Sequence, residues 1–99
     1  MIKIPSKLQG ILWSVPLNKI DLKVHKSYLT HQILMFGSFD DIKWLFNVYP
    51  NNDIKSIFID KPQKIYTPEG FNFVKNFVLN LKDQNIPPKN YVNVIHSKS

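Results

Sequence analysis

Histidine is the residue of this chain best suited to acid–base or metal chemistry, because cysteine is absent. The three histidines are His25, His31 and His96. His25 and His31 are six residues apart, so on a helix they point to different faces and do not share a metal ion. His25 follows Leu22 by three residues on an apolar face, so we expect a half-buried, hydrogen-bonded side chain there. The sequence therefore predicts no metal site.

The other reactive side chains do not form a catalytic set. Asp40 and Asp41 are adjacent, which suits helix capping and compensation of the helix dipole better than a paired acid and base. Ser38 has no base beside it in the sequence and already has a capping role. The three glycines are far apart, so they do not form a phosphate-binding loop. We therefore predict that the protein is not an enzyme and has no catalytic residues and no cofactor.

Lysine supplies all of the positive charge of the chain. All 13 basic residues are lysines, and the formal net charge is +6. Residues 1–30 and 61–99 are basic, whereas residues 31–60 are acidic. A helix-turn-helix around Pro50 would give a DNA-binding module, but base readout usually uses arginine, and the chain has none. The candidate contacts to a nucleic-acid backbone are Lys19, Lys23, Lys26 and Lys55.

The helix predicted between Ser38 and Pro50 carries more apolar surface than one core face requires. Its core stripe, spaced i, i+3, i+4 and i+7, is Ile42, Leu45, Phe46 and Tyr49. Trp44 and Val48 lie on an adjoining face and widen the apolar arc to about 220°. Either this helix is central and contacts neighbours on both sides, or Trp44 and Val48 anchor a protein interface. The second interpretation requires both side chains to be exposed in the isolated chain.

A small helical domain must position these residues. Apolar spacing and capping signals predict four helices, over residues 21–36, 38–49, 51–60 and 67–81. Gly37 is expected to end the first helix with a positive φ. Ser38 is expected to cap the second, Asn51 or Asn52 the third, and Thr67 the fourth.

The fourth helix and the two ends of the chain complete the predicted fold. In the fourth helix, the residues expected to face the core are Phe71, Phe73, Val74, Phe77, Val78 and Leu81. We expect a close neighbour at Gly70 and Trp13 laid onto the core. Residues 91–95 alternate weakly, so they either pair as a strand with residues 1–4 or belong to a loosely ordered tail.

The fold class predicted is all-α, as one small four-helix domain over residues 1–82 with an extended N-terminal segment. Residues 83–99 are expected to form a poorly structured C-terminal tail. The N-terminus lacks the apolar region of a signal peptide, and no apolar run approaches the roughly 20 residues needed to span a bilayer. These features predict a soluble, cytoplasmic protein that does not enter a membrane.

Many residues of the chain also resemble a known family. In order, the matching positions are Ile4-Pro5, Leu12-Trp13, Ile20-Asp21, His25, Gly37-Ser38-x-Asp40, Trp44-Leu45-Phe46-x-x-Tyr49, Ile54, Thr67-Pro68 and Asn72-Phe73. Together they resemble a family of small uncharacterised bacterial proteins that are often encoded beside nucleotidyltransferase-like toxins of the abortive-infection type. The resemblance covers residues 4–81 and implies an antitoxin or accessory role. Lys64 stands where the family pattern has arginine, which keeps the charge but loses the planar guanidinium group.

Two non-enzymatic functions are predicted. The first is a protein-interaction module, most concretely the antitoxin-like partner of a nucleotidyltransferase-type toxin, which covers the toxin's active cleft or holds it inert. Trp44 and Val48 would then be apolar anchors, and Lys61 and Lys64 would contact acidic metal-binding residues of the toxin. The alternative is a helix-turn-helix-like DNA-binding module or autoregulator of its own operon. The sequence does not predict the oligomeric state.

Overall fold

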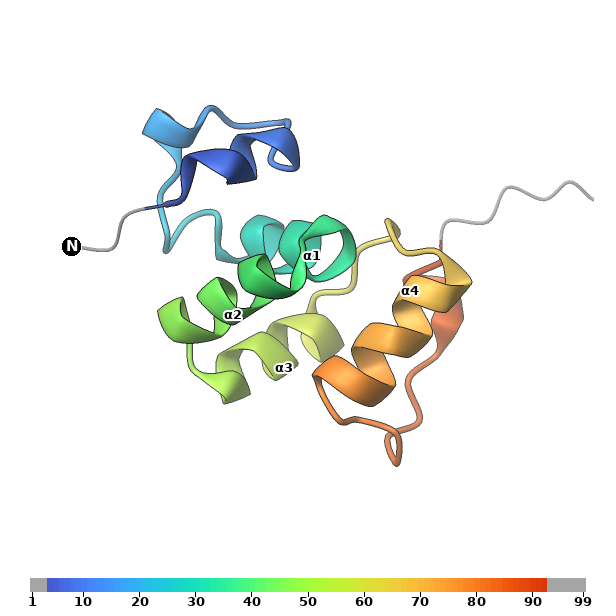
Figure 1. Ribbon diagram of the computed structural model, residues 1–99. Coiled ribbons are helices and arrows are strands. Elements are labelled where there is room, and N and C mark those ends of the chain that lie inside the picture. The colour runs from blue at the N-terminus through green and yellow to red at the C-terminus, as the bar shows by residue number, and fades with distance from the viewer. Residues whose placement is uncertain (1–3, 93–99) are drawn as a thin grey trace, which may run out of the picture.

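Four α-helices build the fold, and short helical turns connect and extend them (Figure 1). The computed structural model describes residues 4–92. Its α-helices are α1 (Lys26–Phe36), α2 (Phe39–Val48), α3 (Asn51–Asp60) and α4 (Pro68–Phe73). A π-helical turn, η3 (Val74–Val78), continues α4, and three 3-10 turns are η1 (Ser6–Gly10), η2 (Leu17–Lys19) and η4 (Pro88–Asn90). The only β-pairing among the described residues is an isolated bridge between Tyr66 and Val92, so the predicted all-α class is confirmed.

The first helix begins later than the apolar spacing predicts, at Lys26 rather than at Asp21. The Asp21 carboxylate accepts the N–H groups of Lys23 and Val24 at 2.8 and 3.0 Å. Such local bonds from an aspartate offer the backbone an alternative to the helix. They hold residues 21–24 in a turn, and α1 starts after it.

A capping box starts α2, as predicted. Ser38 Oγ accepts the N–H of Asp41 at 3.3 Å, and the Asp41 carboxylate accepts the N–H of Ser38 at 2.9 Å. Pro50 ends α2 and is itself the N-cap of α3, with no side-chain hydrogen bond. The predicted asparagine cap of α3 is therefore wrong, because the proline ring already fixes the backbone at the helix start. Asn51 and Asn52 lie inside the helix.

Gly37 does not have the predicted positive φ, since its φ is −77°. It is instead required by a close approach between α1 and α2. A Cβ atom at this position would lie 2.6 Å from the carbonyl oxygen of Ile33 and 2.9 Å from Cβ of Asp41. Glycine therefore lets the two helices meet across a very short connection.

The start of α4 agrees with the prediction, but its continuation does not. Thr67 accepts the N–H of Gly70 at 2.9 Å, and Met35 of α1 packs against Gly70, which confirms the expected close neighbour. Further on, the Leu79 N–H donates to the Val74 carbonyl at 2.9 Å, the spacing of a π-helix.

This helix buries only part of the apolar arc predicted for it. Phe71 and Val74 are buried, whereas Phe73 is 45% exposed and Phe77 is 73% exposed. The prediction that Phe73 and Phe77 face the core with the other residues of the arc is therefore wrong. The helix lies at the edge of the molecule (Figure 1), so its neighbours cover one side of the arc and leave the two phenylalanines outside.

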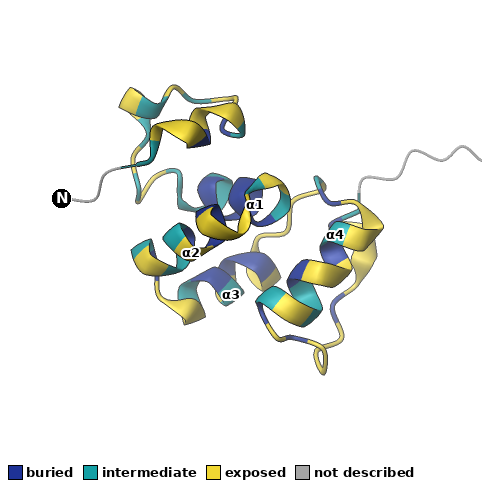
Figure 2. Ribbon diagram, viewed as in Figure 1, coloured by how far each residue is buried: buried dark blue, intermediate teal, exposed yellow. Residues whose placement is uncertain are grey.

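An aromatic cluster from four separate segments forms much of the core. Phe58 of α3 stacks on Tyr91 with ring centroids 4.7 Å apart, and Phe71 of α4 lies 4.9 Å from the same ring. Tyr66 meets Phe58 edge-on at 5.7 Å. The Tyr91 hydroxyl donates to the Phe58 carbonyl at 2.6 Å. Buried residues gather at the centre on α1 and α3, whereas α2 and α4 present exposed outer faces (Figure 2).

The packed unit extends beyond the predicted domain boundary at residue 82. Ile86 and Tyr91 are both buried, because the tyrosine ring fills the space between α3 and α4. Residues 83–92 therefore belong to the domain. Most of the strand predicted over residues 91–95, and most of its proposed partner over residues 1–4, lies outside the described residues.

The N-terminal segment packs along one side of α1 and α2 (Figure 1), and η1 and η2 fold it into two 3-10 turns, so it is less extended than predicted. Leu8 and Leu12 are buried, and the Gln32 side chain donates to the Ile11 carbonyl. Trp13 is not laid onto the core, because its ring is 64% exposed. It packs instead against Phe36 at the end of α1, with ring centroids 5.1 Å apart.

Candidate functional site

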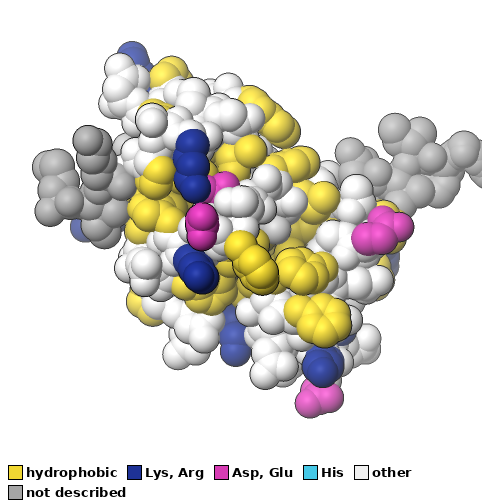
Figure 3. Space-filling view, in the orientation of Figure 1, with side chains coloured by type: hydrophobic (Ala, Val, Ile, Leu, Met, Phe, Trp, Pro, Cys, Tyr) yellow, Lys and Arg dark blue, Asp and Glu magenta, His cyan; other side chains and the backbone are white. Residues whose placement is uncertain are grey.

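An apolar groove between α2 and the continuous helix formed by α4 and η3 is the candidate functional site. Its first wall is α2, with Phe39, Ile42, Lys43 and Phe46. Its second wall consists of Phe73, Phe77 and Val78. The groove holds about 360 Å³, and hydrophobic side chains gather on the molecular surface over these elements (Figure 3).

The local structure of each wall follows from the sequence. The capping box fixes the start of α2, so Phe39, Ile42, Lys43 and Phe46 take the spacing i, i+3, i+4 and i+7 and share one face. Phe73 and Phe77 are four residues apart, and their ring centroids lie 6.0 Å from each other. Each wall is thus one helix face, and the two faces border a common depression.

Most of the aromatic surface in this groove is in contact with solvent. Phe39 is 74% exposed and Phe77 is 73% exposed. Single exposed hydrophobic residues are ordinary in soluble proteins, whereas a contiguous apolar patch often marks an interaction site. Aromatic side chains are also enriched at protein interfaces.

Lys43 is the one charged residue that lines the groove. The ion pairs between described residues join Lys7 to Asp41 at 3.2 Å and Lys26 to Asp53 at 2.6 Å, and neither includes Lys43. Its ammonium group therefore adds a positive charge at the edge of an otherwise apolar surface.

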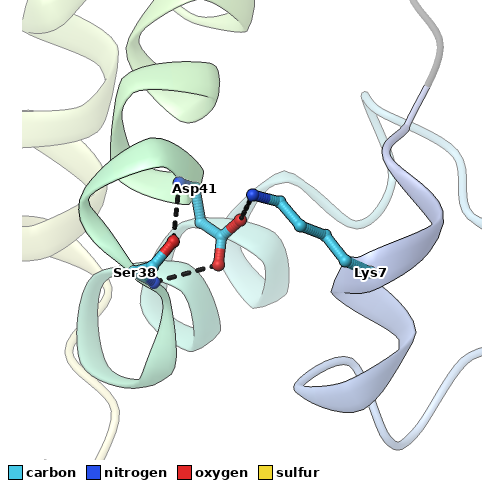
Figure 4. A network of polar contacts seen from close by, with 3 residues as sticks. All are labelled: Lys7, Ser38 and Asp41. Carbon is cyan, nitrogen blue, oxygen red and sulfur yellow. Dashed lines mark hydrogen bonds and ion pairs between the residues drawn. The ribbon is translucent and has the colours of Figure 1, made fainter.

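The neighbouring Asp41 is committed to the structure of α2 (Figure 4). It completes the capping box with Ser38, and its Oδ1 lies 3.2 Å from Lys7 Nζ of the N-terminal segment. Burial raises the pKa of this carboxyl group, but the Ser38 N–H and the Lys7 ammonium outweigh burial, so the pKa lies below its usual 3.8. Asp41 is thus a structural carboxylate that joins α2 to η1.

The two apolar anchors predicted from the sequence lie elsewhere. Trp44 and Val48 are half-buried and pack against the core, so the prediction that both are freely exposed is wrong. The physical reason is that α2 packs on α1, and that Asp41, which shares a helix face with Trp44 and Val48, pairs with Lys7 of the N-terminal segment. Neither residue lines the groove.

A signal for the actual groove was present in the sequence. The i, i+3, i+7 spacing of Phe39, Ile42 and Phe46 marks a second apolar stripe of α2, and Phe73 with Phe77 marks one on the fourth helix. Pattern alone does not show which of two stripes on a helix faces the core. In the structure Ile42 and Leu45 are buried, as the predicted core stripe requires, whereas Phe39 at the start of the other stripe is exposed.

The predicted basic residues fall into two groups. Lys23, Lys26 and Lys61 line a depression between the start of α1 and α3. Lys64 is exposed on the loop before α4, Lys19 is exposed at the end of η2, and Lys55 is half-buried on α3. The structure therefore joins one residue predicted to bind a toxin, Lys61, to two predicted to contact nucleic acid.

The histidines have structural partners. His25 is half-buried, and its Nδ1 accepts the N–H of Asp21 at 2.8 Å, as the sequence predicts. His31 is buried, with Nε2 2.7 Å from the Lys61 carbonyl and Nδ1 2.8 Å from the Tyr66 hydroxyl. The carbonyl only accepts, so Nε2 carries the proton. Burial lowers the pKa of His31 and thereby favours this neutral form; His96 lies outside the described residues.

Residues 4–92 contain no group of three or more histidine, aspartate or glutamate side chains arranged to hold a metal ion. No helix among them has the length and apolar character needed to cross a bilayer.

Comparison with known proteins identifies a family but no described relative. No curated protein and no solved structure matches the chain. One family model matches residues 8–58, a range from η1 to α3 that includes the α2 wall of the groove and precedes Phe73 and Phe77. Since this range is just over half of the 99 residues, the chain belongs to DUF6922, a family of unknown function.

Proposed function

We propose that this protein is a non-enzymatic protein-interaction module that binds its partner in the groove between α2 and the continuous helix formed by α4 and η3. The observation that carries this proposal is the exposure of Phe39, Phe73 and Phe77 around one depression. With their exposed fractions, the three rings present on the order of 400 Å² of apolar surface. A standard interface buries about 800 Å² on each partner, so these three rings would supply about half of the surface that this protein contributes.

The shape and charge of the groove select the kind of partner. A depression between two helix faces suits a third, amphipathic helix whose large apolar side chains recur at i, i+3, i+4 and i+7. The cation of Lys43 at the edge favours a partner helix with an acidic residue beside its apolar stripe. We therefore propose an amphipathic helix with an acidic flank as the bound element.

The finer proposal is that this helix belongs to a nucleotidyltransferase-type toxin and that the protein acts as its antitoxin-like partner in the cytoplasm. It is supported by the family resemblance of residues 4–81 and by the apolar groove. The exposed Lys61 and Lys64 lie on the loop before α4 and are available for acidic residues of such a toxin. Trp44 and Val48 then support α2 from within and do not themselves anchor the partner.

Co-expression with the product of the neighbouring gene tests this function. The tagged wild-type chain is expected to recover the product, and Phe77→Ser is expected to reduce recovery at least tenfold, since a central interface anchor contributes about 2 kcal/mol or more. Ile59→Ser is the control, because Ile59 is also an exposed apolar side chain, at 41%, and lines neither the groove nor the depression that contains Lys61.

Each result of this experiment has a definite meaning. Equal recovery by the wild type and Phe77→Ser would remove the groove from the interface. Recovery by neither protein would remove the toxin as the partner. A dimer of the wild type alone that Phe77→Ser dissociates, seen by light scattering, would assign the groove to a second copy of the chain.

A further inference from the structure

A second depression lies between the start of α1 and the face of α3 that it meets. Lys23, Lys26 and Ser27 line one side, and Ser56 and Lys61 lie on the other. It holds about 250 Å³. This site shares no lining residue with the apolar groove, and six of its eight lining residues are charged or polar, the other two being Val24 and Ile57.

The charge of the depression is positive even after its internal ion pair is counted. Three lysines and one aspartate line it, which gives a formal charge of +2. Lys26 Nζ lies 2.6 Å from Asp53 Oδ2 and 5.3 Å from the centre of the Tyr49 ring, so this cation is held in place. Lys23 and Lys61 take part in no ion pair among the described residues, so both remain available to an anion.

Two hydroxyl groups add neutral donors beside these cations. Ser27 projects from α1 and Ser56 from α3, and both line the depression. Neither hydroxyl makes a hydrogen bond to another side chain or backbone group within residues 4–92. Lysine ammonium and serine hydroxyl groups are common partners of backbone phosphates in protein–nucleic acid complexes.

We propose that this depression binds a phosphate group of a nucleic-acid backbone through Lys23 and Lys61, with Ser27 and Ser56 as hydrogen-bond donors. The net charge of +6 draws a polyanion to the protein from a distance. Because the contact is to a phosphate and not to a base edge, it carries no direct sequence information. The site differs from a helix-turn-helix because it uses the side of α3 that meets α1, and the proposal does not depend on the apolar groove.

Fluorescence anisotropy with a short labelled DNA duplex tests this site. The wild type is expected to bind two duplexes of unrelated sequence equally. Its affinity should fall with salt with a log–log slope of about −0.9 for each phosphate neutralised. Lys23→Ala and Lys61→Ala are each expected to weaken binding several-fold and to make that slope shallower by about one. Asp53→Asn is expected to strengthen binding, because it removes the one negative charge of the depression.

Lys43→Ala is the matched control, since it removes the same charge from the apolar groove instead. Lys43→Ala should leave the affinity for the duplex close to that of the wild type. Phe77→Ser should do the same, because it changes only the apolar groove proposed to bind a protein. Circular dichroism checks that each variant is folded. Equal losses for Lys43→Ala and Lys23→Ala would show a general charge effect and overturn the site. Binding of inorganic phosphate, detected as amide shifts at Ser27 and Ser56, without any binding of the duplex would also overturn it.

Discussion

His31 shows how the role of a single residue depends on its surroundings. Histidine as a residue type suits catalysis, although the sequence gives His31 no catalytic partner. In the structure both ring nitrogens have partners, the Lys61 carbonyl and the Tyr66 hydroxyl, and the side chain is 1% exposed. The buried imidazole, hydrogen-bonded at both ring nitrogens, holds the loop before α4 onto α1. This geometry makes the stability of the fold depend on pH.

The stability of the fold should decrease when the pH falls below about 6.5. Burial lowers the pKa of His31 from its usual 6.5, so in this range the unfolded chain binds a proton that the folded chain does not. The contribution of His31 is therefore complete above about pH 6.5 and is lost as the pH falls towards the folded-state pKa. Urea unfolding at about pH 7.5 and about pH 5.5 measures the difference.

His31→Gln is the variant that isolates this effect. It should lower the free energy of unfolding at neutral pH by about 1–3 kcal/mol, because a buried hydrogen-bond partner is lost. It should also have a smaller loss of stability between the two pH values than the wild type. The pKa of Asp41 is lowered from 3.8, so the stability that this carboxylate contributes is lost only below about pH 3.8, outside the range of this comparison. An unchanged pH dependence in His31→Gln would contradict the assignment.

At the level of the helices, Gly37 and Gly70 both lie where a Cβ atom would be too close to a neighbour, but the two neighbours differ. Gly37 lies between α1 and α2, where a Cβ would approach the Ile33 carbonyl oxygen to 2.6 Å. Gly70 lies in the first turn of α4, where a Cβ would approach Met35 Sδ to 2.7 Å. The first neighbour is backbone and cannot yield, whereas the second is the end of a flexible side chain.

Alanine at these two positions should therefore have unequal effects. Gly37→Ala is expected to lower the free energy of unfolding by about 1–3 kcal/mol, the usual result of overpacking. Gly70→Ala is expected to change the free energy of unfolding by less than about 1 kcal/mol. Alanine has the higher helix propensity, and this gain offsets the cost of moving the Met35 side chain aside. Thermal or urea unfolding of both variants measures the difference.

A second measurement tests the cause of the Gly70 result. Combining Gly70→Ala with Met35→Ala removes the side chain that must move, so the double variant should be more stable than Met35→Ala alone by the helix gain. If Gly70→Ala destabilises the protein as much as Gly37→Ala does, the Met35 side chain does not move aside as proposed.

At the level of the whole molecule, the core joins segments that are distant in the sequence. Phe58, Tyr66, Phe71 and Tyr91 form one aromatic cluster, and the backbone of Tyr66 donates to the Tyr91 carbonyl at 2.9 Å. The last helices are therefore stabilised by a residue that follows them. For this reason the domain includes residues after α4 and η3, as far as Tyr91.

Truncation after Lys82 should strongly destabilise the protein. It removes Ile86 and Tyr91, and loss of one large buried aromatic side chain typically costs about 3–5 kcal/mol. Circular dichroism with thermal unfolding should show a much lower midpoint or no cooperative transition. Truncation after Val92 is the control and should keep most of the stability, whereas equal stability of both truncated chains would place the boundary at residue 82 after all.

The sequence by itself determined the helices and most of their ends. Ser38 with Asp41, Pro50, and Thr67 before Pro68 act over three or four residues, so their effect is visible in a short window of the chain. The all-α class and the structural role of His25 follow from the same local rules. The absence of cysteine and arginine also limited the chemistry of the protein before any fold was known.

Only the tertiary structure decided which helix faces are covered. α2 has two apolar stripes, and the stripe through Phe39 and Phe46 borders the groove because no described segment covers it, whereas α1 and the N-terminal segment enclose the helix on other sides. Phe77 is exposed for the same reason, and Lys61 lies near Lys23 only because α1 meets α3. Burial is a property of neighbours that are distant in sequence, so periodicity identifies an apolar face but not the partner that covers it.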